Sequence, residues 1–330
     1  MNLNVRARLQ RVSKMSVTWG LVRTATRNVA IASACGSFLR GSMSKLAVVI
    51  PSRNEVHLTK TVDGIFSATR GPVSVWAVID GGEWPEDWAA TVERHSPNLH
   101  TIRFGASHGL RASVNAAVAA CQCDAILKCD AHVKFSDGFD QVLLSALGDR
   151  EVLIPRRLRL DAERWEVIND SRPAVDYEYL TPPNDENGGL KGKIWEERAK
   201  ERADLLVDDV PLFQGSCWLM KREYFEFLEL LDEETYGSFF KEPLEIALKA
   251  WLSGGRVRVC KVATYAHWHK QRRGYVLGAG SNEQALAGLR PWLTGKAWHK
   301  QTLPFSAYIQ RFAMPGWSLA ENSPQLPTVV

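Results

Sequence analysis

Apolar and polar positions alternate in blocks along the first half of the chain and predict strands separated by helices. The runs that predict buried strands are "KLAVVIP" (45–51), "VSVWAVID" (73–80), "LHTIRF" (99–104) and "DAILKC" (124–129). Between the first two, Leu58, Val62 and Ile65 recur at helical spacing, and residues 109–121 show the same periodicity. Alternation of this kind predicts an α/β fold with a mostly parallel sheet covered by helices.

Polar clusters follow three of the predicted strands, at Ser52–Glu55, Asp80–Glu83 and Asp130–His132. Parallel sheets bind their ligands beyond the carboxyl ends of the strands, and packing alone does not need polar residues there. The clusters therefore predict the functional site. For Asp130 and His132, the spacing by itself leaves open a polar turn with a solvated histidine.

The second half of the chain is less regular before order returns. Residues 156–213 contain "TPPNDENGG" and a charged helical stretch, which predict a loop-rich insertion, a usual place for substrate recognition. Residues 242–255 then show helical spacing and end at a pair of glycines. The run 256–270 predicts a last strand that closes on His267 and His269.

Composition and charge fit a globular protein of one large domain. The 330 residues are 45% hydrophobic and 24% charged, and the net charge is +4. Seven Arg or Lys and no acid lie in 1–42, which leaves 34 basic against 37 acidic side chains for the remainder. A slightly acidic body argues against a general nucleic-acid binder. We interpret 1–42 as a disordered leader or a mis-assigned start, with a transit peptide or surface-binding helix as the alternative.

Cysteine usage and hydropathy point to a reducing compartment. The six cysteines form no C-x-x-C pair, which is typical of buried free thiols rather than a disulfide framework. No apolar run reaches the roughly 18–20 residues of a membrane span. We therefore expect no integral membrane segment and a cytoplasmic protein, in a bacterial or viral setting.

Six motifs in order carry a resemblance to a known family. They are "IPSRNE", "GLRASVNAAVAAC", "KCDAHVKF", "GSCWLMKREYF", "EPLEIALKAWLSGG" and "TYAHWHK". The set resembles the GT-A glycosyltransferases of the family-2-like superfamily. It is most similar to the polypeptide N-acetylgalactosaminyltransferase branch, which has D-x-H in place of D-x-D. The resemblance implies a GT-A three-layer sandwich over 43–275, and we expect 276–330 to be an extension packing on or near the active site.

The resemblance implies a metal-dependent glycosyltransferase that moves a sugar from a nucleotide-diphosphate donor, with uridine expected, to a hydroxyl acceptor. Asp130, His132 and His267 match the family's metal ligands, and His269 is the fallback. A carboxylate with imidazoles suits Mn²⁺ better than Mg²⁺, which prefers oxygen ligands. The ion would neutralise the diphosphate leaving group.

By the same resemblance, we expect three segments to bind the donor. They are the first nucleotide loop after the strand 45–51, the end of the strand 73–80, and the start of the helix 109–121. The expected donor-binding residues are Pro51, Arg53, Glu55, Asp80, Gly109, Arg111 and Asn115. Asp80 matches the aspartate that reads the nucleobase, and Arg111 adds charge at a helix N-terminus that favours anions. Helix capping, a plain turn and a surface arginine are the alternatives.

Three further groups complete the expected site. Arg272, Arg273 and Tyr275 lie in a basic segment bounded by glycine, which predicts a loop that closes over the diphosphate. Trp218, like Trp268, either stacks on a sugar or is simply packed. In the resembled superfamily, acids at the positions of Glu242 and Glu245 act as base or line the acceptor site, and the choice between inversion and retention stays open.

Two rival functions remain at this point. In the first, Arg156, Arg157 and Arg159 would form a backbone track for DNA that carries hydroxylated bases. The second is a non-catalytic relic that binds nucleotide sugars or carbohydrate, although a relic predicts lost metal ligands. Glycans, proteins and small molecules are equally open as acceptors. The chain has no phosphate-loop motif and no G-x-G-x-x-G after its first strand.

Overall fold

The computed structural model describes residues 46–183, 190–270, 274–278, 280–295 and 297–318. It also describes the backbone of a short antiparallel pair, β1 (Arg23–Thr24) and β2 (Arg27–Asn28). The expected leader 1–42 otherwise lies outside the described residues. The same holds for Arg272 and Arg273 of the expected lid.

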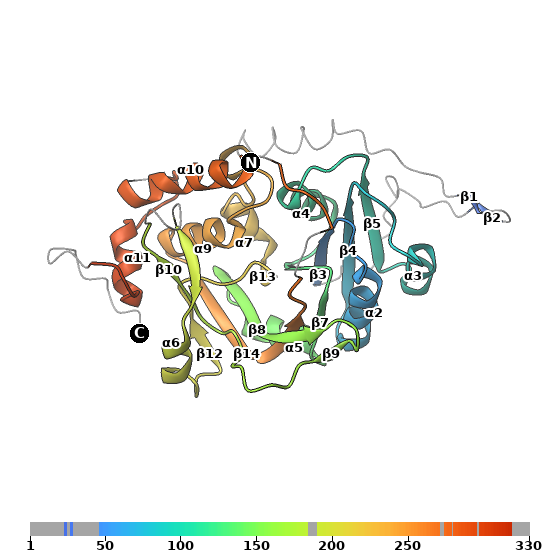
Figure 1. Ribbon diagram of the computed structural model, residues 1–330, viewed down its shortest axis with the longest axis horizontal. Helices are drawn as coiled ribbons and strands as arrows, with labels where there is room; N and C mark the ends of the chain where they lie inside the picture. Colours follow the sequence, from blue (N-terminus) through green and yellow to red (C-terminus); the bar gives the residue numbers. More distant parts are fainter. Residues whose placement is uncertain are drawn as a thin grey trace.

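A ten-stranded sheet forms the centre of the molecule (Figure 1). Its main path runs through β12 (Val207–Asp209), β14 (Arg256–His267), β8 (Glu151–Asp161), β13 (Cys217–Lys221), β6 (Ala125–Cys129), β3 (Leu46–Ser52), β4 (Val73–Asp80) and β5 (Leu99–Phe104). Off this path, β7 (Val133–Phe135) pairs with β14, and β9 (Glu166–Val167) pairs with β8. A separate hairpin joins β10 (Glu178–Thr181) to β11 (Lys191–Ile194).

Strand direction confirms the mostly parallel sheet expected from the continuous apolar runs. Strands β3, β4, β5 and β6 pair in parallel, as do β8 and β14. Strand β13 lies antiparallel between β6 and β8, so both of its neighbours point the same way. The sequence pattern did not reveal this reversal, because β13 is as apolar as the strands around it.

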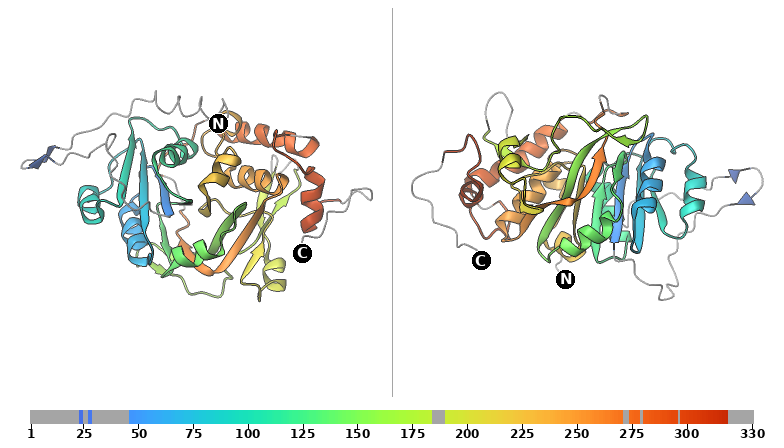
Figure 2. Two further views of the ribbon diagram at one scale, coloured as in Figure 1. Left: turned by 180° about the vertical axis from the view of Figure 1, so that it is seen from behind. Right: turned by 90° about the horizontal axis from the view of Figure 1, so that it is seen from below.

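Helices cover both faces of the sheet (Figure 2). One face carries α2 (Leu58–Ala68), α3 (Trp88–His95) and α5 (Phe139–Ala146). The other carries α4 (Leu110–Ala120), α7 (Arg222–Phe227), α9 (Glu242–Leu252), α10 (Ser281–Thr294) and α11 (Phe305–Phe312). Along β3, Val48 belongs to the first core and Val49 to the second, since successive side chains of a strand point to opposite faces. Burial on both sides explains why the strand is apolar throughout.

The insertion 156–213 is more ordered than its composition indicates. It holds the end of β8, the strands β9 to β12 and the helix α6 (Glu196–Glu201). The C-terminal segment packs beside α9, where Phe312 meets Trp251 and the Tyr308 hydroxyl donates to the Pro211 carbonyl at 2.8 Å. The division into leader, catalytic domain and extension stays a prediction. Among the described residues, no helix has the length and apolar character needed to cross a membrane.

Candidate active site

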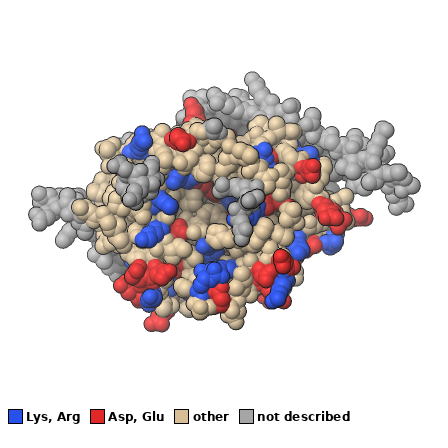
Figure 3. Space-filling model, in the orientation of Figure 1, with Lys and Arg blue, Asp and Glu red and all other residues tan. Residues whose placement is uncertain are grey.

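A cavity of about 960 Å³ opens where β3, β4, β6 and β14 end. Its lining comes from segments within 51–55, 107–113, 128–132, 238–243 and 267–281, together with Asp80 and Gly215. In Figure 3, Lys and Arg side chains gather around a hollow near the centre of the face shown. The cavity therefore lies at the strand ends where the polar clusters of the sequence predict a site.

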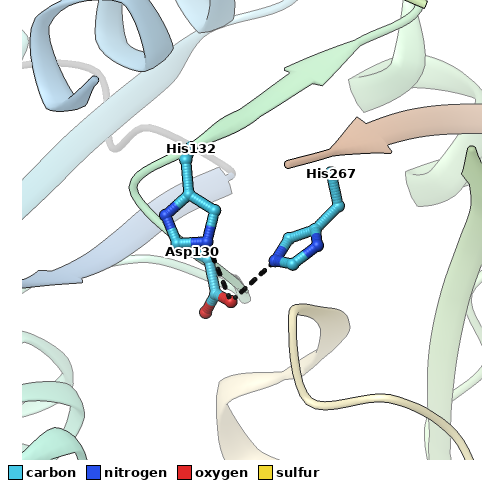
Figure 4. Close-up of side chains that lie close together, drawn as sticks. All are labelled: Asp130, His132 and His267. Carbon is cyan, nitrogen blue, oxygen red and sulfur yellow. Dashed lines mark hydrogen bonds and ion pairs between the residues drawn. The ribbon is translucent and has the colours of Figure 1, made fainter. Parts of the chain in front are cut away.

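Asp130, His132 and His267 meet at the floor of this cavity (Figure 4). Asp130 directly follows β6, His132 lies between β6 and β7, and His267 is the last residue of β14. Because Val133 of β7 pairs with His267, the register of these two strands brings the histidines together. The Asp130 Oδ2 atom is 3.2 Å from His267 Nε2 and 3.9 Å from His132 Nε2.

The donor set fits a divalent transition-metal ion. One atom from each of the three residues lies within 4.8 Å of the others. Burial lowers the pKa of His267 to about 4, which keeps its imidazole neutral, as a ligand must be. Burial opposes ionisation of Asp130, but Lys128 and His267 outweigh it and hold the pKa of that carboxyl well below its usual range. One carboxylate with two imidazoles is a set that suits Mn²⁺.

Glu55 orients one of the histidines. Its Oε2 lies 3.2 Å from His132 Nδ1, which leaves Nε2 facing Asp130. Its other oxygen accepts from the Lys270 ammonium. Burial opposes ionisation, yet the bonds to His132 and Lys270 lower the pKa of Glu55. A carboxylate on the far nitrogen of a ligand histidine fixes its tautomer and ring orientation.

On the other side of Asp130, Lys128 and Glu242 form the rest of the cavity floor. The Lys128 ammonium donates to Asp130 Oδ1 at 2.9 Å and to the Gly215 carbonyl at 2.5 Å. It lies 3.6 Å from Glu242 Oε2, and the Trp218 indole donates to Glu242 Oε1 at 2.6 Å. Burial raises the pKa of Glu242, whose side chain is 4% exposed and lines the cavity.

Comparison with known proteins identifies the family. Residues 47–228, more than half of the chain, match the family model described as glycosyl transferase family 2. The chain belongs to glycosyl transferase family 2. By that membership it is a glycosyltransferase, as the six motifs predict.

The relatives of this glycosyltransferase include N-acetylgalactosaminyltransferases. Human polypeptide N-acetylgalactosaminyltransferase 18 is 27% identical over 214 residues, which cover 61% of this chain and 31% of the relative. A probable N-acetylgalactosaminyltransferase 8 of Caenorhabditis elegans is 34% identical over 90 residues, 27% of this chain and 20% of the relative. The glycosyltransferase thus spans less than a third of either relative.

Two solved structures share the fold of this glycosyltransferase. GalNAc-T7 with UDP, GalNAc and Mn²⁺ superposes with a TM-score of 0.62 at 16% identity, over 75% of this chain and 48% of that one. S. aureus TarS 1–349 in complex with UDP-GlcNAc gives 0.52 at 14% identity, over 82% of this chain and 71% of that one. The likeness confirms the GT-A fold expected from the sequence.

Two residues expected at the site of the glycosyltransferase lie outside the cavity as a buried ion pair. Arg111 and Glu245 are both fully buried and bonded to each other. Lys249 also donates to Glu245 at 2.8 Å, and the Arg111 guanidinium donates to the Phe240 carbonyl at 2.9 Å. The expected contact of Arg111 with phosphate does not fit this burial. Nor does a role for Glu245 at the acceptor, because both charges are satisfied inside the protein.

Trp218 and Asn115 also lie away from the cavity. The Trp218 ring is 0% exposed, so it packs beneath Glu242 and its face is closed to a sugar. Of the two interpretations left open for this tryptophan, packing is the one that fits. The Asn115 side chain donates to the Leu231 carbonyl at 2.9 Å and accepts from the Leu231 amide at 3.3 Å. It therefore fastens α4 to the segment before α8 (Glu233–Tyr236).

Asp80 organises the loop 105–109, which connects β5 to α4. Its carboxylate accepts from Ser107 Oγ and from the backbone amides of His108 and Gly109, at 2.6–2.9 Å. Gly109 has a φ of +96°, and a Cβ there would lie 2.7 Å from the Ser238 carbonyl oxygen. Glycine is therefore required where this loop enters α4. Both residues line the cavity, and the reading of a nucleobase by Asp80 stays a prediction.

The segment 51–55 at the end of β3 meets the segment after β14 at the cavity. Pro51, Arg53 and Tyr275 line the cavity, and the Arg53 guanidinium lies 5.0 Å from the centre of the Tyr275 ring. The Asn54 side chain donates to the Gly274 carbonyl at 3.0 Å, which ties the two segments together. Tyr275 is thus placed as a lid residue would be.

The fallback ligand His269 is exposed and lies outside the group formed by Asp130, His132 and His267. Its ring is 5.6 Å from that of His267, centre to centre, in an edge-to-face arrangement. It lines the cavity together with Trp268, whose ring is edge-on to His132 at 5.9 Å. The geometry therefore favours His267 over His269 as the third ligand.

Sequence reasoning missed two lysines of the site. Lys128 donates to Asp130, and Lys270 donates to Glu55. A lysine inside the apolar run "AILKC" was an available signal, because an unpaired charge is rarely buried in a strand. The sequence puts the insertion 156–213 on the acceptor side of a site, and that stays a prediction. None of its described residues, 156–183 and 190–213, lines the cavity.

Proposed function

We propose that this glycosyltransferase moves a sugar from a UDP-sugar to a hydroxyl acceptor, with Mn²⁺ as its ion. The observation that carries the proposal is the cluster of Asp130, His132 and His267 on the floor of the cavity. Two structural neighbours add support, since one holds UDP with Mn²⁺ and the other holds UDP-GlcNAc. A relic without activity would not need to keep this donor set.

Asp130 Oδ2 and the Nε2 atoms of the two histidines would hold the ion. When bound, a divalent ion supplies Lewis-acid neutralisation of the diphosphate as it leaves the sugar. Glu55 keeps His132 in the tautomer whose Nε2 lone pair faces the site. The burial of His267 keeps its imidazole unprotonated.

The donor would lie between the segment 51–55, the loop 105–109 and the segment after β14. Arg53 donates to Ser107 Oγ at 2.9 Å, so it links the first of these segments to the second. Arg53 and Lys270 both line the cavity and are cations suited to a diphosphate. Tyr275 stands against Arg53, where it would help to exclude water from the donor.

Glu242 would act on the acceptor. Its carboxylate reaches the cavity, and burial raises its pKa toward the range that suits a general base. In an inverting reaction it would take the proton of the acceptor hydroxyl. In a retaining reaction it would hold that hydroxyl in place.

The contacts of three arginines give DNA less support as the acceptor than the sequence pattern did. Arg156 is bonded to Asp176 at 2.6 Å, and Arg157 is 7% exposed and donates to Gln214. Arg159 donates to two backbone carbonyls, of Arg172 and Pro173. Arginines committed to internal bonds are poorly placed to follow a nucleic-acid backbone.

A donor screen tests the proposal. The full chain is incubated with Mn²⁺, a panel of UDP-, GDP- and TDP-sugars, and sugar, peptide and hydroxymethylated DNA acceptors, and products are read by mass spectrometry. We expect transfer from a UDP-sugar that EDTA abolishes. Tighter calorimetric binding of GDP or TDP than of UDP would refute the uridine assignment. Transfer that persists in EDTA would refute the role of the ion.

A further inference from the structure

Lys128 is a fully buried lysine in the middle of the central sheet. It is 1% exposed and lies in β6, opposite Val49 of β3 and Trp218 of β13. Burying an ammonium in such a place costs several kcal/mol unless its charge is compensated. The contacts that compensate it therefore define its role.

The Lys128 ammonium joins three segments that are distant in the sequence. It donates to Asp130 Oδ1 at 2.9 Å and to the Gly215 carbonyl at 2.5 Å, and Glu242 Oε2 is 3.6 Å away. Asp130 is a proposed metal ligand, and Glu242 lines the same cavity and is proposed to act on the acceptor. A single cation thus lies between the two carboxylates with the most prominent roles in the site.

The two oxygens of Asp130 have different partners. Oδ1 is held by Lys128, whereas Oδ2 points to His267 Nε2 at 3.2 Å and to His132 Nε2 at 3.9 Å. Without the bond to Oδ1, the carboxylate could rotate about its side-chain torsions and take Oδ2 away from the histidines. The arrangement leaves one defined oxygen for an ion.

We propose that Lys128 is a positioning residue that aims Asp130 Oδ2 at the metal site and links this ligand to Glu242. The inference rests on the proposed function, because it requires that the cluster binds a divalent ion. Lys128 is itself no metal ligand, because a protonated amine has no lone pair to offer. It acts through Asp130 and Glu242.

The proposal predicts an effect whose sign is opposite to that of simple electrostatics. A cation beside a metal site repels the incoming ion, so its removal would tighten binding if charge alone mattered. If Lys128 positions Asp130, its removal must weaken binding instead. Partners that orient metal ligands are typically worth about 10–100-fold in metal affinity.

The experiment is a Mn²⁺ titration of the full chain, with free Mn²⁺ read by electron paramagnetic resonance. We expect Lys128→Met to raise the Mn²⁺ dissociation constant by about 10–100-fold relative to the wild type. An unchanged or lowered dissociation constant would overturn the proposal. Substrate turnover is not needed for this readout.

Lys249→Met is the matched control. Lys249 is 3% exposed and donates to Glu245 at 2.8 Å and to the Glu229 carbonyl at 2.9 Å, with no bond to a proposed ligand. We expect it to lower the unfolding temperature and leave the Mn²⁺ dissociation constant unchanged. Equal weakening of Mn²⁺ binding in both variants would show that the loss comes from destabilisation, and would also overturn the proposal.

The double variant Lys128→Met with Glu242→Gln covers the case in which Lys128→Met alone does not fold. It removes one positive and one negative charge, so it leaves no carboxylate of α9 uncompensated at this point. We expect the same 10–100-fold weakening. A wild-type chain that binds no Mn²⁺ would refute the proposed function itself. Wild-type binding that survives in both Lys128 variants would refute only the role of Lys128.

Discussion

Helix α9 carries two buried glutamates one turn apart, and they lie in opposite environments. Glu242 faces the cavity and has a single ammonium, that of Lys128, at 3.6 Å. Glu245 is 0% exposed, bonds to Arg111 and Lys249, and accepts from the Asp232 amide at 3.1 Å. We call the first group, Lys128–Asp130–Glu242, the open cluster and the second, Arg111–Glu245–Lys249, the closed cluster.

The difference between the clusters appears in the pKa values of the two glutamates. Burial opposes ionisation at both positions. At Glu245 the two cations outweigh burial and lower the pKa, whereas at Glu242 burial dominates and raises it. Two glutamates with similar burial on one helix therefore have pKa values shifted in opposite directions, because the clusters differ in their cations. The number of paired cations separates a structural charge from a reactive one.

The largest effect is expected when the closed cluster is broken. Glu245→Gln would leave Arg111 and Lys249 buried without a counter-charge, and we expect the free energy of unfolding to fall by about 3–5 kcal/mol. Urea denaturation of the full chain measures this. The matched change Glu242→Gln should cost clearly less stability, because Lys128 keeps Asp130. A larger loss for Glu242→Gln would reverse our assignment of the two clusters.

The next effect concerns Asp130 of the open cluster and its neighbour His132, which are both proposed to hold the ion. Asp130→Ala and His132→Ala should each lower the transfer rate by roughly 10²-fold or more, since each removes a ligand of the proposed ion. EDTA should abolish transfer by the wild type, and Mn²⁺ should restore it best. Circular dichroism should show that both variants remain folded. Wild-type rates in either variant would show that Asp130, His132 and His267 do not hold the ion.

The smallest effect separates two histidines at the end of β14. His267→Ala should raise the Mn²⁺ requirement at least tenfold, a loss of about 1.4 kcal/mol. His269→Ala should leave metal affinity nearly unchanged and act on donor turnover, because His269 is exposed and outside the cluster. Manganese titration of the two variants measures the difference. Loss of the metal in His269→Ala alone would move the ligand by two residues.

The sequence by itself determined the α/β class of the fold and four strands of its central sheet, and it predicted the place of the site. The apolar runs predicted β3, β4, β5 and β6, because strands buried on both faces must be apolar throughout. The Asp130-x-His132 motif predicted two ligands at the end of a strand, where a parallel sheet binds its substrates. These inferences needed only local periodicity and chain order.

Only the tertiary structure decided which charged residues belong to the site. The sequence treats Glu242 and Glu245 alike, and Arg111 looked available for phosphate until α4 and α9 were seen to bury it against Glu245. The pairing of β7 with β14 brings His132 close to His267. The two residues are 135 positions apart in the sequence, so no local pattern could predict this contact. The physical reason is that the pKa and reach of a charged group depend on burial and on partners distant in the sequence.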